Sequence, residues 1–344
     1  MPKHTEDGST LVTLASDCCR AVLSNVGARL LELHVPDRDG VMADVVLARP
    51  TLSEVLADGS YMGAIAGRYA GRLRGARFSL DGHTHHLASN EGDNHLHGGD
   101  RGFDQQVWDL DVHPGGEAVT FTRSSPDGEE GYPGTVSATV TYALRGTTLE
   151  VSMSATTDRP TIVRLVQHAY WNLAGHDQGN ILDHVLRLDA SHYIPLDAEL
   201  LPSGEVRAVA GTAYDFRTPK PIGADLDRVE NSGAGRVATA SAGYDDVWAL
   251  DGVGMRSVAT LADPASGRRL ELSTDQPGIC IYVGGYLGGT PAKGDLGHYG
   301  DFAGLTLETT GFPDDANIAE FPSPVLRPEE TYLHRMRLDF SVAD

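Results

Sequence analysis

Apolar and polar residues alternate along much of this chain with a period of two. In residues 148–156, apolar side chains stand at every second position, from Leu149 to Ala155, with Glu, Ser and Thr between them. Successive side chains of a β-strand point to opposite faces, so this pattern predicts a strand with one buried and one solvent-facing row. Residues 136–142 and 332–340 show the same alternation and predict two more strands.

Turn signals between such runs predict β-hairpins. Asp81-Gly82 lies between short runs at 78–80 and 83–87, and such a dipeptide favours a two-residue hairpin turn. A segment with Pro and Gly at 263–267 separates two further runs in the same way. The chain is therefore expected to be built mostly from antiparallel hairpins.

Helical patterning is sparse, and the best candidate is a short helix at 52–56 with Thr51 or Ser53 as its N-cap. No repeat, low-complexity tract or long linker divides the sequence. We predict an all-β sandwich that forms a single domain over residues 10–342, preceded by a polar N-terminal tail at 1–9.

Composition limits the possible partners and the compartment. The 344 residues carry 27 Lys and Arg against 48 Asp and Glu, a formal net charge of −21. This charge repels phosphate backbones and anionic lipid surfaces, so we expect neither nucleic acid nor a membrane as a partner. The sequence shows no secretory signal and no apolar run of roughly 20 residues. Its three cysteines form no CxxC pair, which favours a cytoplasmic protein without a disulfide framework.

Five of the 14 histidines lie between residues 83 and 97. On a strand, His83 and His85 share a face, so a two-histidine metal-ligand pair is geometrically possible, while His86 points to the other side. Nothing nearby supplies the further ligands of a recognised metal site. A structural or solvent-exposed role is therefore favoured for these three histidines.

The second histidine pair, His95 and His97, lies among glycines and polar residues at 94–104. This composition is typical of a loop whose backbone can approach a ligand closely. Residues 67–72 carry two arginines between glycines, the second being Arg72. Taken alone, that segment favours surface ion pairs as the role of its arginines.

Two further segments carry candidate chemistry. Residues 167–173 join His168 to two aromatic residues and an amide, a combination that sugar sites use for ring faces and hydroxyls. The same segment is equally compatible with a core strand that holds a buried, hydrogen-bonded histidine. Residues 305–310 alternate cleanly, so Glu308 shares a face with two threonines; a solvent-facing position is the usual one for Glu.

Taken in order, these segments resemble the aldose 1-epimerase, or galactose mutarotase, family. Each block alone is weak, but the ordered set extends from about residue 10 to the C-terminus. The matching blocks are 67–72, 94–103, 168–173, 193–197, 202–205, 214–217, 243–245, 307–309 and 315–317. The resemblance implies a large antiparallel β supersandwich with few short helices. It also implies interconversion of the α and β anomers of free aldoses without a cofactor or a metal.

The resemblance further implies roles for single residues. Glu308 matches the family's general base and His168 its general acid. The expected sugar-binding residues are Arg72, His97, Asp245 and, because it lies in the His168 block, Tyr170.

Acid–base chemistry explains why such groups suit the reaction. A base takes the proton of the C1 hydroxyl while an acid protonates the ring oxygen, and closure from the other face reverses both transfers. A Glu with an ordinary pKa of about 4.3 is ionised at neutral pH, and an imidazole of about 6.5 needs only a small push to be partly protonated. We hypothesise that Glu308 and Asp245 keep His168 protonated.

Four positions near the expected pocket depart from the family pattern. The family usually has Asn at Gly71, His at Asp246, an amide at Cys280, and Thr-Gly-Asn at the tripeptide that ends in Gly285. The loss of groups that bind hydroxyls relaxes or redirects sugar choice, so the sequence does not assign galactose. Cys280 fits a small buried strand residue better than a nucleophile, because no adjacent base is evident.

Other functions stay open on the sequence alone. A mutarotase-like epimerase or cyclase of a modified sugar or secondary metabolite would use the same acid and base. Glu308 and Asp245 could instead be the paired carboxylates of a glycoside hydrolase, and a sugar-binding module without catalysis would need neither. The acidic chain favours a neutral sugar over a phosphorylated one, and we expect a monomer or homodimer.

Overall fold

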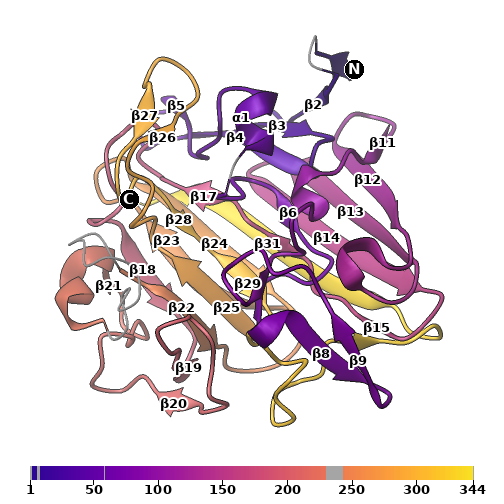
Figure 1. Cartoon of the computed structure of the whole chain (residues 1–344). Helices are drawn as coiled ribbons and strands as arrows, with labels where there is room; N and C mark the ends of the chain where they lie inside the picture. Colours follow the sequence, from indigo (N-terminus) through magenta and orange to yellow (C-terminus); the bar gives the residue numbers. More distant parts are fainter. Residues whose placement is uncertain (1, 6–7, 58, 230–242, 344) are drawn as a thin grey trace.

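The computed structural model describes residues 2–5, 8–57, 59–229 and 243–343, and strands dominate its regular structure. The largest sheet consists of antiparallel strands, and Figure 1 shows β31, in yellow, in the middle of it. In spatial order these strands are β11 (Asp109–Val112), β12 (Ala118–Ser125), β13 (Val136–Arg145), β14 (Thr148–Thr157), β31 (Tyr332–Val342), β24 (Arg268–Thr274), β23 (Arg256–Ala262), β18 (Val185–Leu188) and β21 (Lys220–Pro221).

The three runs with the clearest alternation form the centre of this sheet as β13, β14 and β31, which confirms the predicted strands. On β14, Leu149, Val151 and Met153 are buried and the residues between them are more exposed. Val151 lies opposite Tyr142 on one neighbouring strand and Met336 on the other. The register therefore continues one apolar row across all three strands, and this row faces the core.

Two smaller sheets flank the largest one. The first contains β1 (Lys3–His4), β2 (Thr10–Ala15), β3 (Arg20–Ser24), β4 (Arg29–Pro36) and β5 (Met42–Asp44). The second has the order β20 (Arg207–Ala208), β19 (His192–Ile194), β22 (Asp245–Ala249), β25 (Gly278–Tyr282) and β29 (Glu308–Thr310). Short two-stranded pairs complete the described strands: β6 (Ile65–Ala66) with β16 (Val166–Gln167), β7 (Arg72–Leu73) with β10 (His95–Leu96), β8 (Arg77–Leu80) with β9 (His83–His86), β15 (Thr161–Ile162) with β30 (Val325–Leu326), β17 (Tyr170–Trp171) with β28 (Leu305–Thr306), and β26 (Thr290–Pro291) with β27 (His298–Tyr299).

One apolar cluster joins the three sheets. Leu23 comes from the N-terminal sheet, Val140 and Leu338 from the largest sheet, and Trp248 and Ile279 from the sheet that holds β22 and β25. All five side chains are almost completely buried. The sheets therefore share one core, as expected for the all-β antiparallel supersandwich predicted from the sequence.

The local turn and helix predictions are confirmed. Asp81 and Gly82 both have positive φ, 48° and 81°, and join β8 to β9, as a tight hairpin turn requires. Helix α1 (Leu52–Leu56) begins after Thr51, whose side chain accepts the N–H of Glu54; Thr51 rather than Ser53 is thus the cap. Within the described part of the chain, no helix is long and apolar enough to cross a membrane.

The histidine-rich strand β9 lies on the outside of the molecule. His83 and His86 are exposed, and His85 is half-buried because its ring stacks on Phe78 at 5.1 Å between centroids. This placement agrees with the structural or solvent-exposed role expected for these residues.

The N-terminal residues contribute to the first sheet. Lys3 and His4 pair with Leu11 and Thr10 of β2, whereas residues 1, 6 and 7 lie outside the described residues. The division into a domain at 10–342 and a tail at 1–9 stays a prediction.

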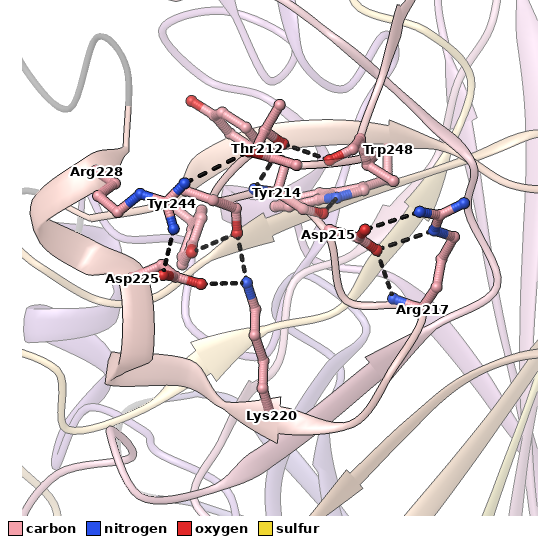
Figure 2. Close-up of polar contacts among 12 residues, drawn as sticks. Thr212, Tyr214, Asp215, Arg217, Lys220, Asp225, Arg228, Tyr244 and Trp248 are labelled. Carbon is pink, nitrogen blue, oxygen red and sulfur yellow. Dashed lines mark hydrogen bonds and ion pairs between the residues drawn. The ribbon is translucent and has the colours of Figure 1, made fainter.

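Figure 2 shows polar contacts that hold residues of strand β22 and the residue before it. The Tyr244 hydroxyl donates to the Ala213 carbonyl at 2.9 Å, and Trp248 Nε1 donates to the Tyr214 carbonyl at 2.9 Å. Lys220 Nζ bridges the same Ala213 carbonyl and Asp225, both at 2.7 Å. The contacts of Tyr244 and Trp248 hold the chain before and after Asp245. They therefore fix the backbone of β22 from which the Asp245 side chain extends.

We predict that Leu338→Ala lowers the free energy of unfolding by about 2–5 kcal/mol, because it leaves a cavity in the shared core. Leu338 is 1% exposed and lies between Leu149 and Leu272. Leu333→Ala on the same strand is the matched control, since that side chain is 55% exposed and should cost at most about 0.5 kcal/mol. Urea denaturation measures both, and equal losses would contradict the assigned core face.

Candidate active site

A cavity of about 370 Å³ opens beside strands β22, β25 and β29, a size within the range of roughly 300–1,000 Å³ that is usual for small-molecule sites. Side chains from segments far apart in the sequence line it. All six residues predicted from the sequence are among them: Arg72, His97, His168, Tyr170, Asp245 and Glu308.

One side of the cavity is built by strand register. Val247 on β22 lies opposite Cys280 on β25, and Cys280 lies opposite Glu308 on β29. Directly paired residues point to the same face of a sheet, with Cβ atoms about 4.5–5.5 Å apart. These three side chains therefore form one row along the cavity. Asp245, two residues before Val247, points to the same face.

His168 meets the carboxylate at the end of this row. It follows β16, and its backbone is fixed on both sides, because its N–H donates to Ala64 O at 2.8 Å and its carbonyl accepts from Gly63 N at 2.9 Å. His168 Nε2 lies 3.3 Å from Glu308 Oε1, and both side chains are 6% exposed. An imidazole and a carboxylate at this distance can exchange a proton and act as an acid–base pair.

Aromatic rings enclose the imidazole. The centroid of the His168 ring lies 5.8 Å from that of Tyr61, 5.2 Å from His97 and 5.3 Å from Tyr170. The Tyr170 hydroxyl donates to the Ser60 carbonyl at 3.0 Å, which holds its ring in place. These rings keep water from most of the acid–base pair while the cavity side stays open.

Burial changes the acidity of Glu308. Desolvation raises its pKa to about 8, and the negative charge of Asp245 adds to the rise. A hydrogen bond from the Thr306 hydroxyl and the positive charge of Arg72 act in the opposite direction. The expectation of an ordinary carboxylate, ionised with a pKa of about 4.3, is therefore wrong for the free site. The solvent-facing alternative is also wrong, because Glu308 is buried.

His97 is placed by a tight loop. Leu96 pairs with Arg72, and the Gly71 N–H donates to His97 Nδ1 at 3.2 Å. The chain then turns through Gly98, where a Cβ would stand 1.8 Å from the Gly67 carbonyl oxygen, so only glycine fits. Burial, followed by the charge of His168, holds the pKa of His97 well below its usual value. His97 is thus neutral with its proton on Nε2.

His95 is directed elsewhere, although it lies in the same loop. It is fully buried, its Nε2 contacts the Tyr132 hydroxyl at 2.6 Å and its Nδ1 the Ala88 carbonyl at 2.8 Å. It does not line the cavity. The geometry therefore agrees with the choice of His97 over His95.

Arg72 lies at the cavity, held by two carboxylates. Its Nε and Nη2 donate to the two oxygens of Glu91 at 2.7 and 2.9 Å, and Nη2 lies 3.9 Å from Asp245 Oδ2. Burial opposes its charge, but Asp245 and Glu91 outweigh burial and raise its pKa. Arg68 is 2% exposed and donates to the Gly134 carbonyl at 2.8 Å. The expected ion pair is therefore confirmed for Arg72, but the expected surface position is wrong for both arginines.

Sequence reasoning missed several residues of this site. Glu91 precedes the histidine loop and carried no recognisable signal except its place in a Gly- and Asn-rich turn. Tyr61 stands in a Gly-rich segment, and Tyr282 ends the strand that holds Cys280; both line the cavity. Thr306 shares a face with Glu308 and donates a hydrogen bond to its carboxyl group. The alternating pattern of residues 305–310 could have suggested this contact.

The four departures from the family pattern divide into two groups. Gly71 and Cys280 line the cavity, whereas Asp246 and Gly285 are not among its lining residues. Asp246 is buried, and its carboxylate accepts the Asp245 N–H at 3.2 Å. Gly71 and Cys280 thus lie at the pocket, as expected. Asp246 and Gly285 do not line it.

Two groups of three side chains in the described part of the chain bring possible metal ligands within 4.8 Å of one another. They are His97, His168 and Glu308 in the cavity, and Glu32, His34 and Asp44 on the N-terminal sheet. In the first group, His97 Nδ1 already accepts a backbone N–H. In the second, the carboxylates already bind Arg20 at 2.7 Å and Lys293 at 2.6 Å. Each group is thus engaged in contacts within the protein.

Comparison with known proteins decides the family. The sequence matches the family model described as aldose 1-epimerase over residues 10–339. The chain belongs to the aldose 1-epimerase family. It is 41% identical over 332 residues to galactose mutarotase of Homo sapiens, covering 96% of this chain and 93% of the human one. It is 34% identical to aldose 1-epimerase of Escherichia coli strain K12, covering 96% and 95% of the two chains.

Solved structures agree with this assignment. An aldose epimerase homologue from C. elegans superimposes on the epimerase with a TM-score of 0.88 at 28% identity, covering 98% of this chain and 100% of the other. A galactose 1-epimerase from Lactobacillus acidophilus NCFM gives a TM-score of 0.85 at 28% identity, covering 100% and 98%. The chain is thus an isomerase of the aldose 1-epimerase family on a supersandwich fold.

We predict that Glu91→Gln raises KM about five- to tenfold with a smaller change in kcat. The amide cannot accept both hydrogen bonds of Arg72, and hydrogen bonds to charged groups contribute about 1.5–3 kcal/mol. Glu199→Gln is the matched control, because Glu199 contacts Asn94 of the same loop at 3.1 Å but does not line the cavity. Steady-state kinetics of both variants with an aldose substrate test this prediction. If Glu91→Gln and Glu199→Gln have the same KM, Glu91 has no role in holding Arg72.

Proposed function

We propose that this chain interconverts the α and β anomers of a free neutral aldose, with Glu308 as general base and His168 as general acid. The contact that carries the proposal is the 3.3 Å approach of His168 Nε2 to Glu308 Oε1 on a cavity of about 370 Å³. Both groups can reach a single sugar from there, because the C1 hydroxyl and the ring oxygen are bonded to the same carbon.

The proton transfers balance over one cycle. Glu308 takes the proton of the C1 hydroxyl as the C1–O1 bond becomes a carbonyl, the bond from C1 to the ring oxygen breaks, and His168 protonates that oxygen. The aldehyde then rotates about the bond between C1 and C2. On reclosure at the other face, His168 takes its proton back from the attacking hydroxyl and Glu308 returns its proton to O1, so no net proton, electron or leaving group remains.

The raised pKa of Glu308 suits this role. A general base is most effective when its pKa lies near the working pH, since it then combines adequate ionisation with strong basicity. Burial supplies the shift to about 8. In the reactive form the carboxylate faces an imidazolium, so each charge of the buried pair is compensated by the other.

The remaining predicted residues hold the sugar. His97, with its proton on Nε2, donates to a sugar oxygen, and Asp245 accepts from a hydroxyl. Arg72 donates with the guanidinium hydrogens that Glu91 leaves free for the cavity. Tyr170 offers an aromatic wall for the apolar side of the ring.

A neutral substrate fits the charges of the cavity better than a phosphorylated one. In the described part of the chain, three arginines line the cavity, Arg49, Arg72 and Arg164. Arg164 is paired with Asp315 and Arg72 with Glu91, so the charges of two of the three are already compensated, which disfavours a phosphate dianion. Glycoside hydrolysis is less well supported, because the partner of Glu308 is an imidazole rather than a second carboxylate.

A reducing compartment such as the cytoplasm suits the thiols. Cys18, Cys19 and Cys280 are all free, and free thiols persist where glutathione keeps them reduced. The state of assembly as monomer or homodimer stays a prediction.

Glu308→Gln and His168→Asn should each lower kcat by about 10²- to 10⁴-fold, the usual contribution of a positioned proton-transfer group. Polarimetry of freshly dissolved α-glucose and α-galactose measures the rate of equilibration. Glu271→Gln and His192→Asn, which do not line the cavity, are the controls and should retain normal rates. Near-normal activity in correctly folded cavity variants would overturn the assignment.

The pH dependence should report the buried carboxyl. Below about pH 8 Glu308 is protonated in the free enzyme and cannot accept the C1 proton. The value of kcat/KM should therefore rise with pH from 6 through 8, because only about half of the carboxyl groups are ionised at pH 8. Thr306→Val removes the hydrogen bond that lowers this pKa, so the rise should move to higher pH. A flat profile, or a move to lower pH in the variant, would contradict the role of Glu308.

A further inference from the structure

One part of the cavity lining is apolar, and we call it the apolar wall: Leu196, Leu200, Val247 and Cys280. Leu196 and Val247 belong to a buried apolar cluster on which Leu200 and Cys280 also pack. A thiol is only a weak hydrogen-bond donor and acceptor. Burial and the nearby charges of Glu308 and Asp245 raise the pKa of Cys280, so it faces the cavity as a neutral group.

Strand register places this wall directly beside the proposed base. Val247, Cys280 and Glu308 follow one another across β22, β25 and β29. Strand β29 is the outer strand of its sheet, and His168 contacts Glu308 at that end. The order along the cavity is therefore His168, Glu308, Cys280 and Val247.

Of the groups that can bind hydroxyls strongly, Arg72, Glu91 and His97 lie on other elements. Asp245, by contrast, lies on β22, two residues before Val247. Arg72 and Glu91 form a bidentate pair, His97 follows β10, and Asp245 lies within 3.9 Å of Arg72. These four line the cavity as well. The cavity thus has a charged polar side and an apolar side that meet at Asp245, and the acid–base pair borders both.

The geometry of C1 connects this order to the substrate. Apart from hydrogen, C1 carries the ring oxygen, the O1 hydroxyl and C2. With the ring oxygen at His168 and O1 at Glu308, C2 is the remaining heavy-atom neighbour of C1, and Cys280 is the next side chain in the row beyond Glu308.

We propose that the substituent on C2 of the substrate lies against the apolar wall, so that 2-deoxyaldoses are substrates as good as their parent sugars. This inference rests on the proposed function and deepens it by naming a substrate class. A site that reads a hydroxyl through buried polar groups rejects the analogue that lacks it by several orders of magnitude, because those groups are left unpaired. The apolar wall leaves no such group unpaired when the C2 hydroxyl is absent.

The experiment compares kcat/KM for 2-deoxy-D-glucose with D-glucose, and for 2-deoxy-D-galactose with D-galactose, after subtraction of the spontaneous rates. The ratio of parent to 2-deoxy sugar should stay within about threefold, since no strong hydrogen bond is lost. A loss of about a hundredfold or more for both 2-deoxy sugars would overturn the proposal. This measurement uses the unaltered protein and does not depend on the folding of a variant.

A variant assigns the tolerance to the wall. Cys280→Gln introduces an amide that can bind the C2 oxygen, so the ratio of parent to 2-deoxy sugar should rise about tenfold. Cys18→Gln, the same change at a thiol in the turn between β2 and β3, should leave the ratio as it is. An unchanged ratio in folded Cys280→Gln would place the C2 substituent elsewhere and overturn the proposal.

A third sugar separates local from general tolerance. The proposal places the C3 hydroxyl on the polar side, so the rate with 3-deoxy-D-glucose should fall more than tenfold. Equal turnover of all deoxy sugars would overturn the role of the apolar wall while leaving mutarotation intact. No acceleration with any aldose would overturn the proposed function and this inference together.

Discussion

The cavity depends on the burial of one carboxyl group beside one imidazole. Glu308 is enclosed on an edge strand, and desolvation raises its pKa to about 8. A buried charge is tolerated only when a partner compensates it, and the His168 imidazole lies 3.3 Å away, where a proton transfer between the two groups creates both charges together. Desolvation disfavours the ionised carboxylate and raises its pKa. The same desolvation therefore costs stability and makes Glu308 a stronger base near neutral pH.

The surrounding structure holds this pair by elements outside the long strands. The largest sheet supplies the core, but the cavity is lined by short strands and by loops that are fixed through their own contacts. Glu91 accepts two hydrogen bonds from Arg72, and His97 accepts one from the Gly71 N–H. Polar anchors around β22 fix Asp245 in the same way. Rigid positioning of several polar groups is what a proton-transfer site requires.

Much of the fold could be predicted from the sequence because side-chain direction in a strand is a local property. The alternation in β13, β14 and β31 determined which row faces the core, and Asp81-Gly82 determined its hairpin. The six candidate residues came from an ordered family resemblance, and all six line one cavity. Periodicity alone left Glu308 with a solvent-facing alternative, because alternation does not reveal what covers a polar row.

By itself, the sequence determined the all-β class, the core rows of its long strands and, through the family resemblance, six of the residues that meet in the cavity. Only the tertiary structure decided the state of those residues: the raised pKa of Glu308, the grip of Glu91 on Arg72, and the neighbourhood of Cys280 and Glu308. The reason is physical. Strand patterning follows from adjacent residues, whereas desolvation and cross-strand pairing depend on atoms that are distant in the chain and meet only after folding.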